Sequence, residues 1–328
     1  MVTTPLVQIT GLRLQAGAQV LVDSLDLTLH AGEWLGLVGE SGSGKSLTAL
    51  AILALLPAGV RATAGRILWA GSDVLALDPA ALRALRGGGI GVLFQDPLAS
   101  LDPLRRIGAQ YAEAFAAHGG PRGAAAWDQA AELLARLGLP DPGAALQAFP
   151  HQLSGGMRQR AALALALAGQ PRLLIADEPT TALDPLHAAG LRALVAAERR
   201  SRGCAVLWIS HDLASVREHA DTVAVLYAGQ VMEVGPARAV LAAPRHPYTQ
   251  ALLACTAPPV AGRWQEIGGQ VPAASAVPAG CRFHPRCPQA QARCAAETPP
   301  AVALAAQHRA ACWPLLGPGT PVPGFSGS

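Results

Sequence analysis

Lysine is nearly absent from this sequence of 328 residues: of its 25 lysines and arginines, only Lys45 is a lysine. An arginine side chain ends in a planar, bulky fork, whereas a lysine side chain ends in a compact point charge. A sequence that otherwise uses arginine therefore keeps lysine at a place where the compact charge is needed. The single lysine marks its surroundings as a candidate site before any motif is considered.

Charge and long apolar runs are also scarce. Charged residues make up 14% of the chain, the net charge is +3, and no basic tract stands out, which gives no support to nucleic-acid binding. The longest apolar run, residues 47–60, contains Pro57 and is shorter than the roughly 20 residues of a membrane-spanning helix. The first residues show no basic region followed by an apolar one, so no signal peptide is expected. We therefore expect a cytoplasmic chain that docks on a separate membrane protein if it serves a membrane.

The hydrophobic content, 51%, is that of a folded protein, and its distribution predicts an α/β fold. Helical stretches separate most of the predicted strands, and this alternation predicts a parallel sheet covered by helices. An alanine-rich, mainly helical block at 103–168 interrupts the alternation and is expected to form an inserted subdomain. Apolar segments typical of buried strands lie at 34–39, 89–95, 172–178, 204–210 and 221–227.

A glycine-rich stretch around the lone lysine fits the phosphate-loop pattern GxxxxGK[ST] without deviation. It follows a predicted strand and opens a predicted helix, as that pattern requires. Its glycines let backbone N–H groups converge on phosphate oxygens, and the helix N-terminus adds partial positive charge. We predict that Lys45 contacts the β- and γ-phosphates and that the Ser46 hydroxyl ligates Mg²⁺. The predicted nucleotide-binding residues are Gly39, Glu40, Ser41, Gly42, Ser43, Gly44, Lys45, Ser46 and Asp177.

Two carboxylates end a second apolar strand, LLIADE. Asp177 at the strand tip is placed to hold Mg²⁺, and Glu178 is placed to polarise the attacking water as a general base. A buried strand with a polar end is the alternative interpretation, which the upstream phosphate loop disfavours. The pair therefore completes a predicted site for ATP and Mg²⁺.

The segment LSGGMRQR resembles the signature motif of ABC ATPases. Its Ser-Gly-Gly opens a helix and so offers N–H groups and a hydroxyl to an anion. The resemblance implies that this motif closes over ATP held by a partner subunit, and that the partner's motif closes over ATP held here. The residues expected to act in this way are Leu153, Ser154, Gly155, Gly156 and Gln159.

Three further elements match this family in order. Gln95 resembles the Q-loop glutamine, which senses Mg²⁺ and water and leads toward the permease contact. Residues 182–184, which end in Asp184, resemble the D-loop at the dimer seam, and His211 resembles the switch histidine that contacts the γ-phosphate. The resemblance thus implies a catalytic set of Glu178, His211 and Gln95, with Ser46, Gln95 and Asp177 around Mg²⁺.

Residues 94–108, 246–254 and 270–294 resemble the oligopeptide/dipeptide-importer branch of the family, which also contains nickel importers. The implied fold is a P-loop NTPase core with an inserted helical subdomain and a small C-terminal cysteine-containing domain. The implied domains are an ABC ATPase nucleotide-binding domain at 1–245 with its helical subdomain at about 96–165, an importer-type C-terminal domain at 246–313, and a disordered tail at 314–328.

The resemblance implies an ATPase that energises import of di- and oligopeptides from the cytoplasmic face of the cell membrane. Nickel or another small solute is the alternative cargo. Implied partners are transmembrane permease subunits, a second ABC ATPase, with a heterodimer favoured over a homodimer, and, indirectly, an external solute-binding protein. A chromosome-associated ABC ATPase would need a long coiled coil after the phosphate loop, and residues 46–153 contain no heptads. The importer-type C-terminal region disfavours an exporter.

One family element is missing. ABC ATPases usually stack an aromatic side chain on adenine from a position upstream of the phosphate loop, and residues 1–29 contain no Phe, Tyr, Trp or His. Two alternatives stay open. Either an aliphatic side chain such as Leu14 or Val20 packs on the base, or the base binds more loosely.

Four cysteines gather near the end of the chain: Cys281, Cys287, Cys294 and Cys312. Their spacing lacks the close pairs of zinc sites. Four thiolates suit an iron–sulfur cluster, and the resemblance to the importer branch implies a [4Fe–4S] cluster at these positions. Zinc and buried thiols without metal are the alternatives. Cys204 and Cys255 are expected to be ordinary buried residues.

Overall fold

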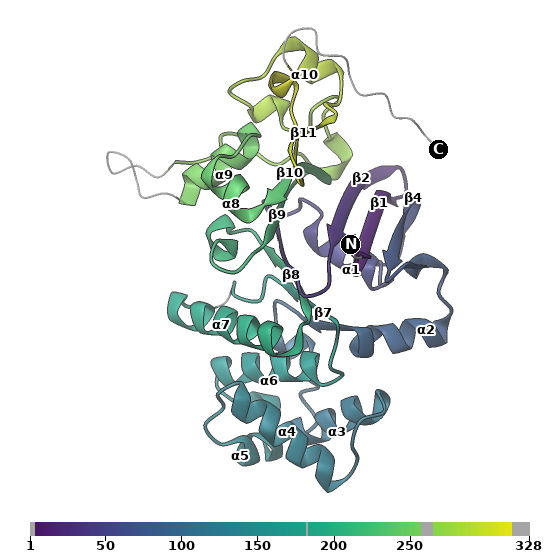
Figure 1. The fold of residues 1–328 in the computed structure, drawn as a ribbon, viewed down its shortest axis with the longest axis vertical. Helices are drawn as coiled ribbons and strands as arrows, with labels where there is room; N and C mark the ends of the chain where they lie inside the picture. Colours follow the sequence, from purple (N-terminus) through teal and green to yellow (C-terminus); the bar gives the residue numbers. More distant parts are fainter. Residues whose placement is uncertain (1–3, 182, 257–264, 317–328) are drawn as a thin grey trace.

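A computed structural model of the chain describes residues 4–181, 183–256 and 265–316. Figure 1 shows an elongated molecule with a helical end, a central sheet, a second sheet beside it, and the C-terminal segment at the opposite end. The predicted tail at 314–328 falls mostly outside the described residues, which end at 316.

The central sheet has eight strands within the described ranges. From one edge to the other they are β11 (Ala301–Ala305), β12 (His308–Ala311), β10 (Gln230–Pro236), β9 (Thr222–Tyr227), β3 (Trp34–Val38), β8 (Ala205–Ser210), β7 (Leu173–Asp177) and β6 (Ile90–Leu93). Neighbours from β9 to β6 pair in parallel, and β10, β11 and β12 pair antiparallel. Strands β3 and β8 are buried along their whole length, as in parallel strands that are covered on both faces. The predicted α/β fold is confirmed.

An antiparallel sheet lies beside the central one (Figure 1). In spatial order its strands are β2 (Gln19–Leu29), β1 (Val7–Ala16), β4 (Val60–Trp69) and β5 (Ser72–Asp73). Leu25, Leu27 and Leu29 of β2 are buried and alternate with exposed residues, so one face of this sheet packs on the core. The helix α1 (Lys45–Ile52) contributes Ala49 and Ile52 to the same core, and the short helix α2 (Pro79–Ala84) follows β5.

The helical end of the molecule lies beyond β6 and β7 (Figure 1). Its helices are α3 (Ile107–Ala117), α4 (Ala124–Arg136), α5 (Pro142–Gln147) and α6 (Gly155–Leu167), and α7 (Pro185–Arg202) runs between them and the sheet. On α4 the buried residues Ala126, Ala130 and Leu133 recur at helical spacing, so one stripe of this helix faces the core. The Tyr111 hydroxyl on α3 donates to the Ala161 carbonyl on α6, which ties two of the helices together.

The C-terminal segment extends the central sheet, because β12 pairs with β10. Its helices are α8 (Ala237–Ala242), α9 (Pro247–Thr256) and α10 (Ala292–Ala296), with 3-10 turns η6 (Ala274–Ala276) and η7 (His284–Arg286). The fully buried Glu233 of β10 accepts hydrogen bonds from the backbone N–H groups of Arg245 and His246. Its carboxylate also lies 2.9 Å from Nε2 of His308. A buried carboxylate with this many partners fixes the segment to the sheet.

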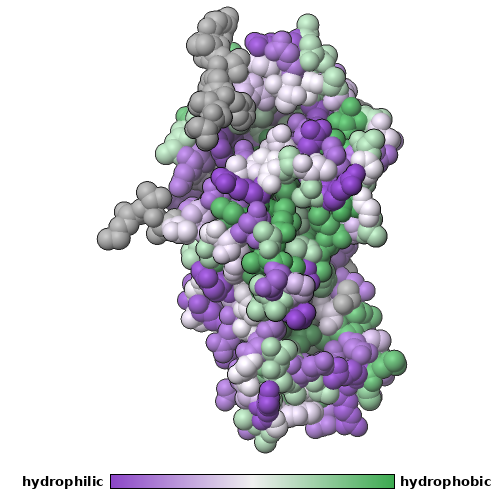
Figure 2. All heavy atoms as spheres, turned by 90° about the vertical axis from the view of Figure 1, so that its right-hand side faces the viewer, coloured by the Kyte–Doolittle hydropathy of each residue, from purple (hydrophilic) through white to green (hydrophobic). Residues whose placement is uncertain are grey.

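No helix in the described part of the chain is long and apolar enough to cross a membrane. Figure 2 shows the face on the right-hand side of Figure 1. Hydrophobic residues gather at mid-height on this face, and hydrophilic residues are spread over the rest of it.

Candidate functional site

The phosphate loop, residues 39–46, joins the carboxyl end of β3 to the start of α1. Gly39 has a φ of 153°, and a Cβ at this position would lie 2.0 Å from the Leu226 carbonyl oxygen of the neighbouring strand. Gly44 caps α1 in the left-handed conformation, with a φ of 101°. Glycine is therefore required at both ends of the loop, once by close packing and once by the backbone turn.

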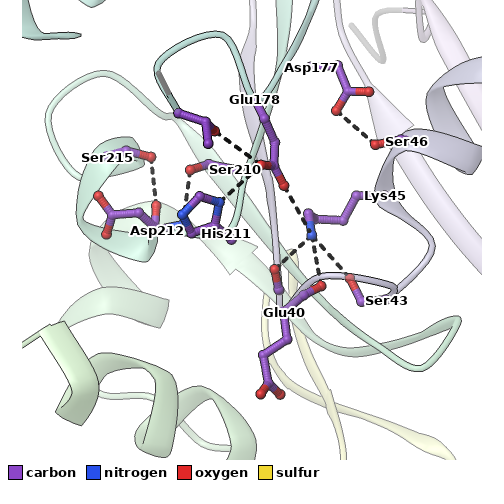
Figure 3. Close-up of polar contacts among 12 residues, drawn as sticks. Glu40, Ser43, Lys45, Ser46, Asp177, Glu178, Ser210, His211, Asp212 and Ser215 are labelled. Atoms are coloured by element: carbon purple, nitrogen blue, oxygen red, sulfur yellow. Dashed lines mark hydrogen bonds and ion pairs between the residues drawn. The ribbon is translucent and has the colours of Figure 1, made fainter. Parts of the chain in front are cut away.

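Lys45 is buried and its amine points along the loop (Figure 3). Nζ donates to the carbonyl oxygens of Gly39 at 2.8 Å and Glu40 at 2.9 Å, and it lies 3.8 Å from a carboxylate oxygen of Glu178. Burial lowers the pKa of Lys45, and the Glu178 carboxylate opposes that shift. The compact ammonium thus sits between the loop and the predicted general base.

Ser46 and Asp177 form a pair at the start of α1 and the end of β7. The Ser46 hydroxyl donates to Oδ1 of Asp177 at 3.0 Å (Figure 3). Burial raises the pKa of Asp177, and the hydrogen bond from Ser46 partly offsets this. A hydroxyl and a carboxylate side by side are oxygen ligands of the kind that Mg²⁺ takes. The residues present therefore fit the predicted Mg²⁺ site.

Glu178 follows β7 in a left-handed backbone conformation, with a φ of 45°. Such a conformation is rare outside glycine and persists only where the surroundings hold it. Here the Glu178 N–H donates to the carbonyl of Ile209 on β8 at 3.0 Å, and Oε2 accepts from the Thr181 hydroxyl at 3.1 Å. The carboxylate is thereby turned toward Lys45 and the loop.

His211 lies next to Glu178, with 3.1 Å between Nδ1 and Oε2 (Figure 3). It follows β8 directly, and the turn after it is closed by two hydrogen bonds, from the Asp212 N–H to Ser210 and from the Ser215 hydroxyl to the Asp212 carbonyl. These bonds fix the backbone on which the histidine stands. The predicted base and the predicted switch histidine are therefore brought into contact.

A cleft of about 420 Å³ opens over the loop, and we call it the phosphate-loop cleft. It is lined by Val20, Leu21, Ser41, Gly42, Ser43, Gly44, Lys45, Ser46, Leu47, Gln95, Glu178, Ala228, Pro272, Ala274 and Val277. Gln95, which is exposed, thus shares the cleft with the loop and with Glu178. The pattern of the sequence gave no indication that three residues of the C-terminal segment, at positions 272, 274 and 277, also line it.

The lining of the cleft distinguishes Leu14 from Val20, the two aliphatic residues considered for packing on the base. Leu14 is fully buried in the core, so it is not available to a ligand. Val20 is half-buried and lines the phosphate-loop cleft. Of the two, only Val20 is placed to touch a bound nucleotide.

The predicted signature residues lie outside this cleft. Ser154 caps α6, since its Oγ accepts from the Met157 N–H at 3.3 Å, and Gly155 is exposed. Leu153 is buried, and the buried Gln159 side chain donates to the Pro179 carbonyl at 2.6 Å, just after Glu178. One chain thus carries two separate helix N-termini suited to anions, one at the loop and one at α6.

Asp184 caps α7. Its Oδ1 accepts from the N–H groups of Leu186 at 3.1 Å and His187 at 3.0 Å. Hydrogen bonds from His187 hold the pKa of the exposed Asp184 below its ordinary value. Ala182, in the same predicted D-loop, lies outside the described residues.

Two side chains of the C-terminal segment contact the phosphate loop directly. Tyr248 on α9 accepts a hydrogen bond from the Glu40 N–H at 2.9 Å. Arg286 in η7 pairs with both carboxylate oxygens of Glu40, at 2.8 and 3.0 Å. Sequence reasoning missed both residues, because neither belongs to a motif with a phosphate function.

The structure does not support the predicted iron–sulfur cluster. Within the described residues, which include all four C-terminal cysteines, no three Cys, His, Asp or Glu side chains form a group that could hold a metal ion. Burial, together with the neighbouring thiols, raises the pKa of Cys312 to about 12, and burial raises those of Cys281 and Cys287. Cys204 is buried as expected, whereas Cys255 is half-buried.

Comparisons with known proteins agree with this geometry. The family model "ABC transporter" matches residues 22–181, and the model "Oligopeptide/dipeptide transporter, C-terminal region" matches residues 232–294. The dipeptide transport ATP-binding protein DppD of Escherichia coli (strain K12) is 43% identical over 304 residues, which cover 92% of this chain and 93% of DppD. A putative peptide import ATP-binding protein of Brucella abortus (strain 2308) is 41% identical over 321 residues, 96% of each chain.

Solved structures show the same fold. The structure of cbiO1 from Clostridium perfringens, part of the ABC transporter complex cbiONQ, has a TM-score of 0.65 at 24% identity and covers 73% of this chain and 92% of its own. The ATP-binding cassette MJ0796, solved as a dimer in a post-hydrolysis state bound to ADP and Pi, has a TM-score of 0.62 at 26% identity and covers 71% and 99%. These matches confirm the resemblance that the sequence motifs carried.

Proposed function

We propose that this chain, which belongs to the family of ABC transporter ATP-binding proteins, hydrolyses ATP to drive peptide import through membrane permease subunits. One observation carries the chemical part of this proposal. The phosphate loop, with Ser46, and Glu178 line one cleft, and Asp177 and His211 contact Ser46 and Glu178 respectively. Such a set has the parts needed to hold a triphosphate, a divalent cation and an attacking water.

In the proposed reaction the loop N–H groups and Lys45 hold the triphosphate, and Ser46 and Asp177 hold Mg²⁺, which neutralises phosphate charge when bound. Glu178 accepts a proton from the attacking water, since its carboxylate faces the loop and Lys45. His211 orients that carboxylate through the 3.1 Å contact and reaches toward the γ-phosphate. Gln95 lines the same cleft and contacts the cation and the attacking water.

We further propose that two ATPase subunits sandwich two ATP molecules. The α6 N-terminus with Ser154 and Gly155 is exposed and lies outside the cleft of its own chain, so it is free to meet a triphosphate held by a partner. Leu186, beside the predicted D-loop, has an 80% exposed side chain, which a partner at this seam would cover. The family relative MJ0796, solved as a dimer, supports this arrangement.

The proposed permease contact lies on the helical subdomain, which we place at about residues 96–165 within a nucleotide-binding domain at 1–245. A groove of about 480 Å³ runs between β6 and the helices, with Phe94, Arg105 and Glu113 in its lining. The connecting segment after Gln95 also exposes Leu98 by 42% and Leu104 by 84%. An exposed apolar surface next to Gln95 can pass closure of the ATP sandwich to a membrane partner.

Peptide cargo is proposed from the relatives, which are named as dipeptide and peptide import proteins, and from the C-terminal match at 232–294. Nickel or another small solute is the second candidate. We propose a second, different ATPase as the partner, an external solute-binding protein that acts through the permease, and a place on the cytoplasmic face of the cell membrane. The C-terminal domain is proposed at 246–313.

Glu178→Gln tests the chemical assignment, with Glu132→Gln on the exposed face of α4 as the matched control. Loss of the general base is expected to lower ATP turnover about 100-fold or more, to leave ATP binding intact and to trap a closed dimer in gel filtration. Normal turnover by Glu178→Gln would refute the role of Glu178.

Capture of the tagged chain from gently solubilised native membranes tests the transport assignment. Mass spectrometry of the captured complex should identify multi-spanning permeases and either one or two kinds of ATPase chain. Recovery without any membrane partner would leave the ATPase chemistry intact and contradict the importer.

A further inference from the structure

We propose that the C-terminal segment supplies the missing wall for the nucleotide base: Pro272, Ala274 and Val277 close the apolar end of the phosphate-loop cleft against Val20 and Leu21 of β2. The inference rests on the proposed ATPase function and names a subsite within it. It assigns a base-binding role to residues more than 220 positions away from the phosphate loop.

The lining of the cleft divides by chemistry. Its polar side chains are those of the loop serines, Lys45, Gln95 and Glu178, which are suited to the triphosphate, the cation and the water. The remaining side chains are aliphatic or proline, and they come from β2, from Leu47 of α1, from Ala228 after β9 and from the C-terminal segment. A nucleotide carries its charge at one end and a flat aromatic base at the other, and the aliphatic part of the cleft suits the apolar faces of that base.

The proposed wall includes the segment upstream of the phosphate loop, from which ABC ATPases usually supply the aromatic side chain that stacks on adenine. β2 reaches the loop itself, since a Cβ on Gly44 would lie 3.1 Å from a methyl group of Val22 and 3.5 Å from the Leu21 carbonyl. The η6 turn, which carries Ala274, packs against β2. Val20 and Val277 are both half-buried, so each keeps part of its surface available to a ligand.

Ion pairs hold this wall in place. Arg282 is buried, donates to Asp23 of β2 at 2.7 Å and also donates to the Ala228 carbonyl. Arg286, while paired with Glu40, donates to the carbonyls of Gly268 at 2.7 Å and Ile267 at 3.2 Å. The chain that leads into the wall is therefore anchored to the phosphate loop on one side and to β2 on the other. Such anchoring pre-forms the subsite before a nucleotide binds.

The test compares two alanines of the same 3-10 turn. Both Ala274 and Ala276 are exposed, but only Ala274 lines the cleft. We expect Ala274→Asp to weaken ATP binding about tenfold, because a carboxylate there must be desolvated against the base. Ala276→Asp should bind ATP like the unaltered chain. Val277→Asp is the second variant, and the melting temperature of each variant verifies that the full-length chain is folded.

Inorganic tripolyphosphate separates this subsite from the phosphate site. It lacks a base, so Ala274→Asp and Val277→Asp should leave its affinity within about twofold in 0.15 M salt, where distant charges are screened. Lys45→Ala should weaken both tripolyphosphate and ATP. If Ala274→Asp and Val277→Asp bind ATP as tightly as Ala276→Asp, the proposed base wall is overturned. In that case weaker binding by Lys45→Ala would still support the phosphate site. An unchanged affinity of Lys45→Ala for both ligands would instead overturn the proposed ATP site.

Discussion

Arg286 and Glu40, 246 positions apart in the chain, form a doubly hydrogen-bonded ion pair at the phosphate loop. Nη1 of Arg286 also donates to the Tyr227 hydroxyl at 3.3 Å, and the Arg286 guanidinium lies over the Tyr227 ring. The planar fork of arginine matches a carboxylate in this two-bond geometry. The pair neutralises a carboxylate of the phosphate loop that would otherwise be unpaired.

Arg286→Ala is therefore expected to raise the KM for ATP about three- to tenfold, because an unpaired Glu40 repels phosphate. The value of kcat should change less, since the pair touches neither Glu178 nor His211. Arg293→Ala removes an exposed arginine that pairs with Glu297 in the same segment, and it should leave KM unchanged.

The double variant Glu40→Gln/Arg286→Ala decides whether repulsion is the cause. Removing the carboxylate should restore most of the affinity for ATP that Arg286→Ala loses. If the double variant binds ATP as weakly as Arg286→Ala, the arginine acts through the backbone of residues 267–268 rather than through charge.

Lys45→Arg tests why the chain keeps one lysine. The buried Lys45 amine donates to two loop carbonyls, and the larger, planar guanidinium of an arginine does not fit the same place. We expect ATP affinity to fall at least about tenfold even though the charge is conserved. Calorimetric titration of the purified variant measures this, and near-normal affinity would contradict the steric argument.

Gly156→Asp tests the proposed action of the signature on a partner's ATP. A Cβ at Gly156 meets only ordinary contacts, the nearest at 3.5 Å from the His187 ring, so the fold should persist. The isolated subunit should bind ATP normally, and turnover of the assembled transporter should fall by about 100-fold, since a carboxylate faces the partner's phosphates. Ala124→Asp, at the exposed N-terminus of α4, is the control. Weakened ATP binding by the isolated Gly156→Asp subunit would place the motif at its own chain's nucleotide instead.

The buried His246 side chain should make the free energy of unfolding depend on pH. Burial lowers the pKa of His246 to about 3, and its Nδ1 accepts a hydrogen bond from the Tyr248 N–H at 3.0 Å, which a protonated ring could not do. Between about pH 6.5 and 3 the unfolded chain binds this proton and the folded chain does not, so stability falls as the pH falls, by about 1.4 kcal/mol per pH unit at most. Urea unfolding at pH 7 and pH 5 should show this dependence reduced in His246→Gln. An identical loss of stability in both proteins would contradict the assignment.

Several elements were predictable because their causes are local. The apolar segment 172–178 forms β7 (Leu173–Asp177), and α7 (Pro185–Arg202) is capped by Asp184 and ended by Gly203. The helical block at 103–168 is divided into α3 to α6 where glycine and proline interrupt it. Shortly after His211 the chain forms only a 3-10 turn, η5 (Leu213–Val216), and the Ser215 hydroxyl closes it by donating to the Asp212 carbonyl.

The candidate site was predictable to the extent that its chemistry is concentrated in short motifs. The lone lysine, the loop around it, and the Asp177–Glu178 pair at a strand end could each be recognised from neighbouring residues. Bringing His211 to Glu178 required only that adjacent parallel strands end at the same edge of a sheet. The left-handed backbone of Glu178 had no signal in the sequence, since nothing about a glutamate indicates a positive φ.

The sequence by itself determined the phosphate loop, the parallel strands that present it and the separate helix N-terminus at Ser154. These depend on glycine, on periodicity and on caps, which act over a few residues. Only the tertiary structure decided that Val20 rather than Leu14 reaches the cleft, that Tyr248 and Arg286 hold Glu40, and that the four C-terminal cysteines do not assemble a metal group among the described residues. Those facts depend on contacts across 200 residues or more, or on which side chains the core buries, and no local pattern records them.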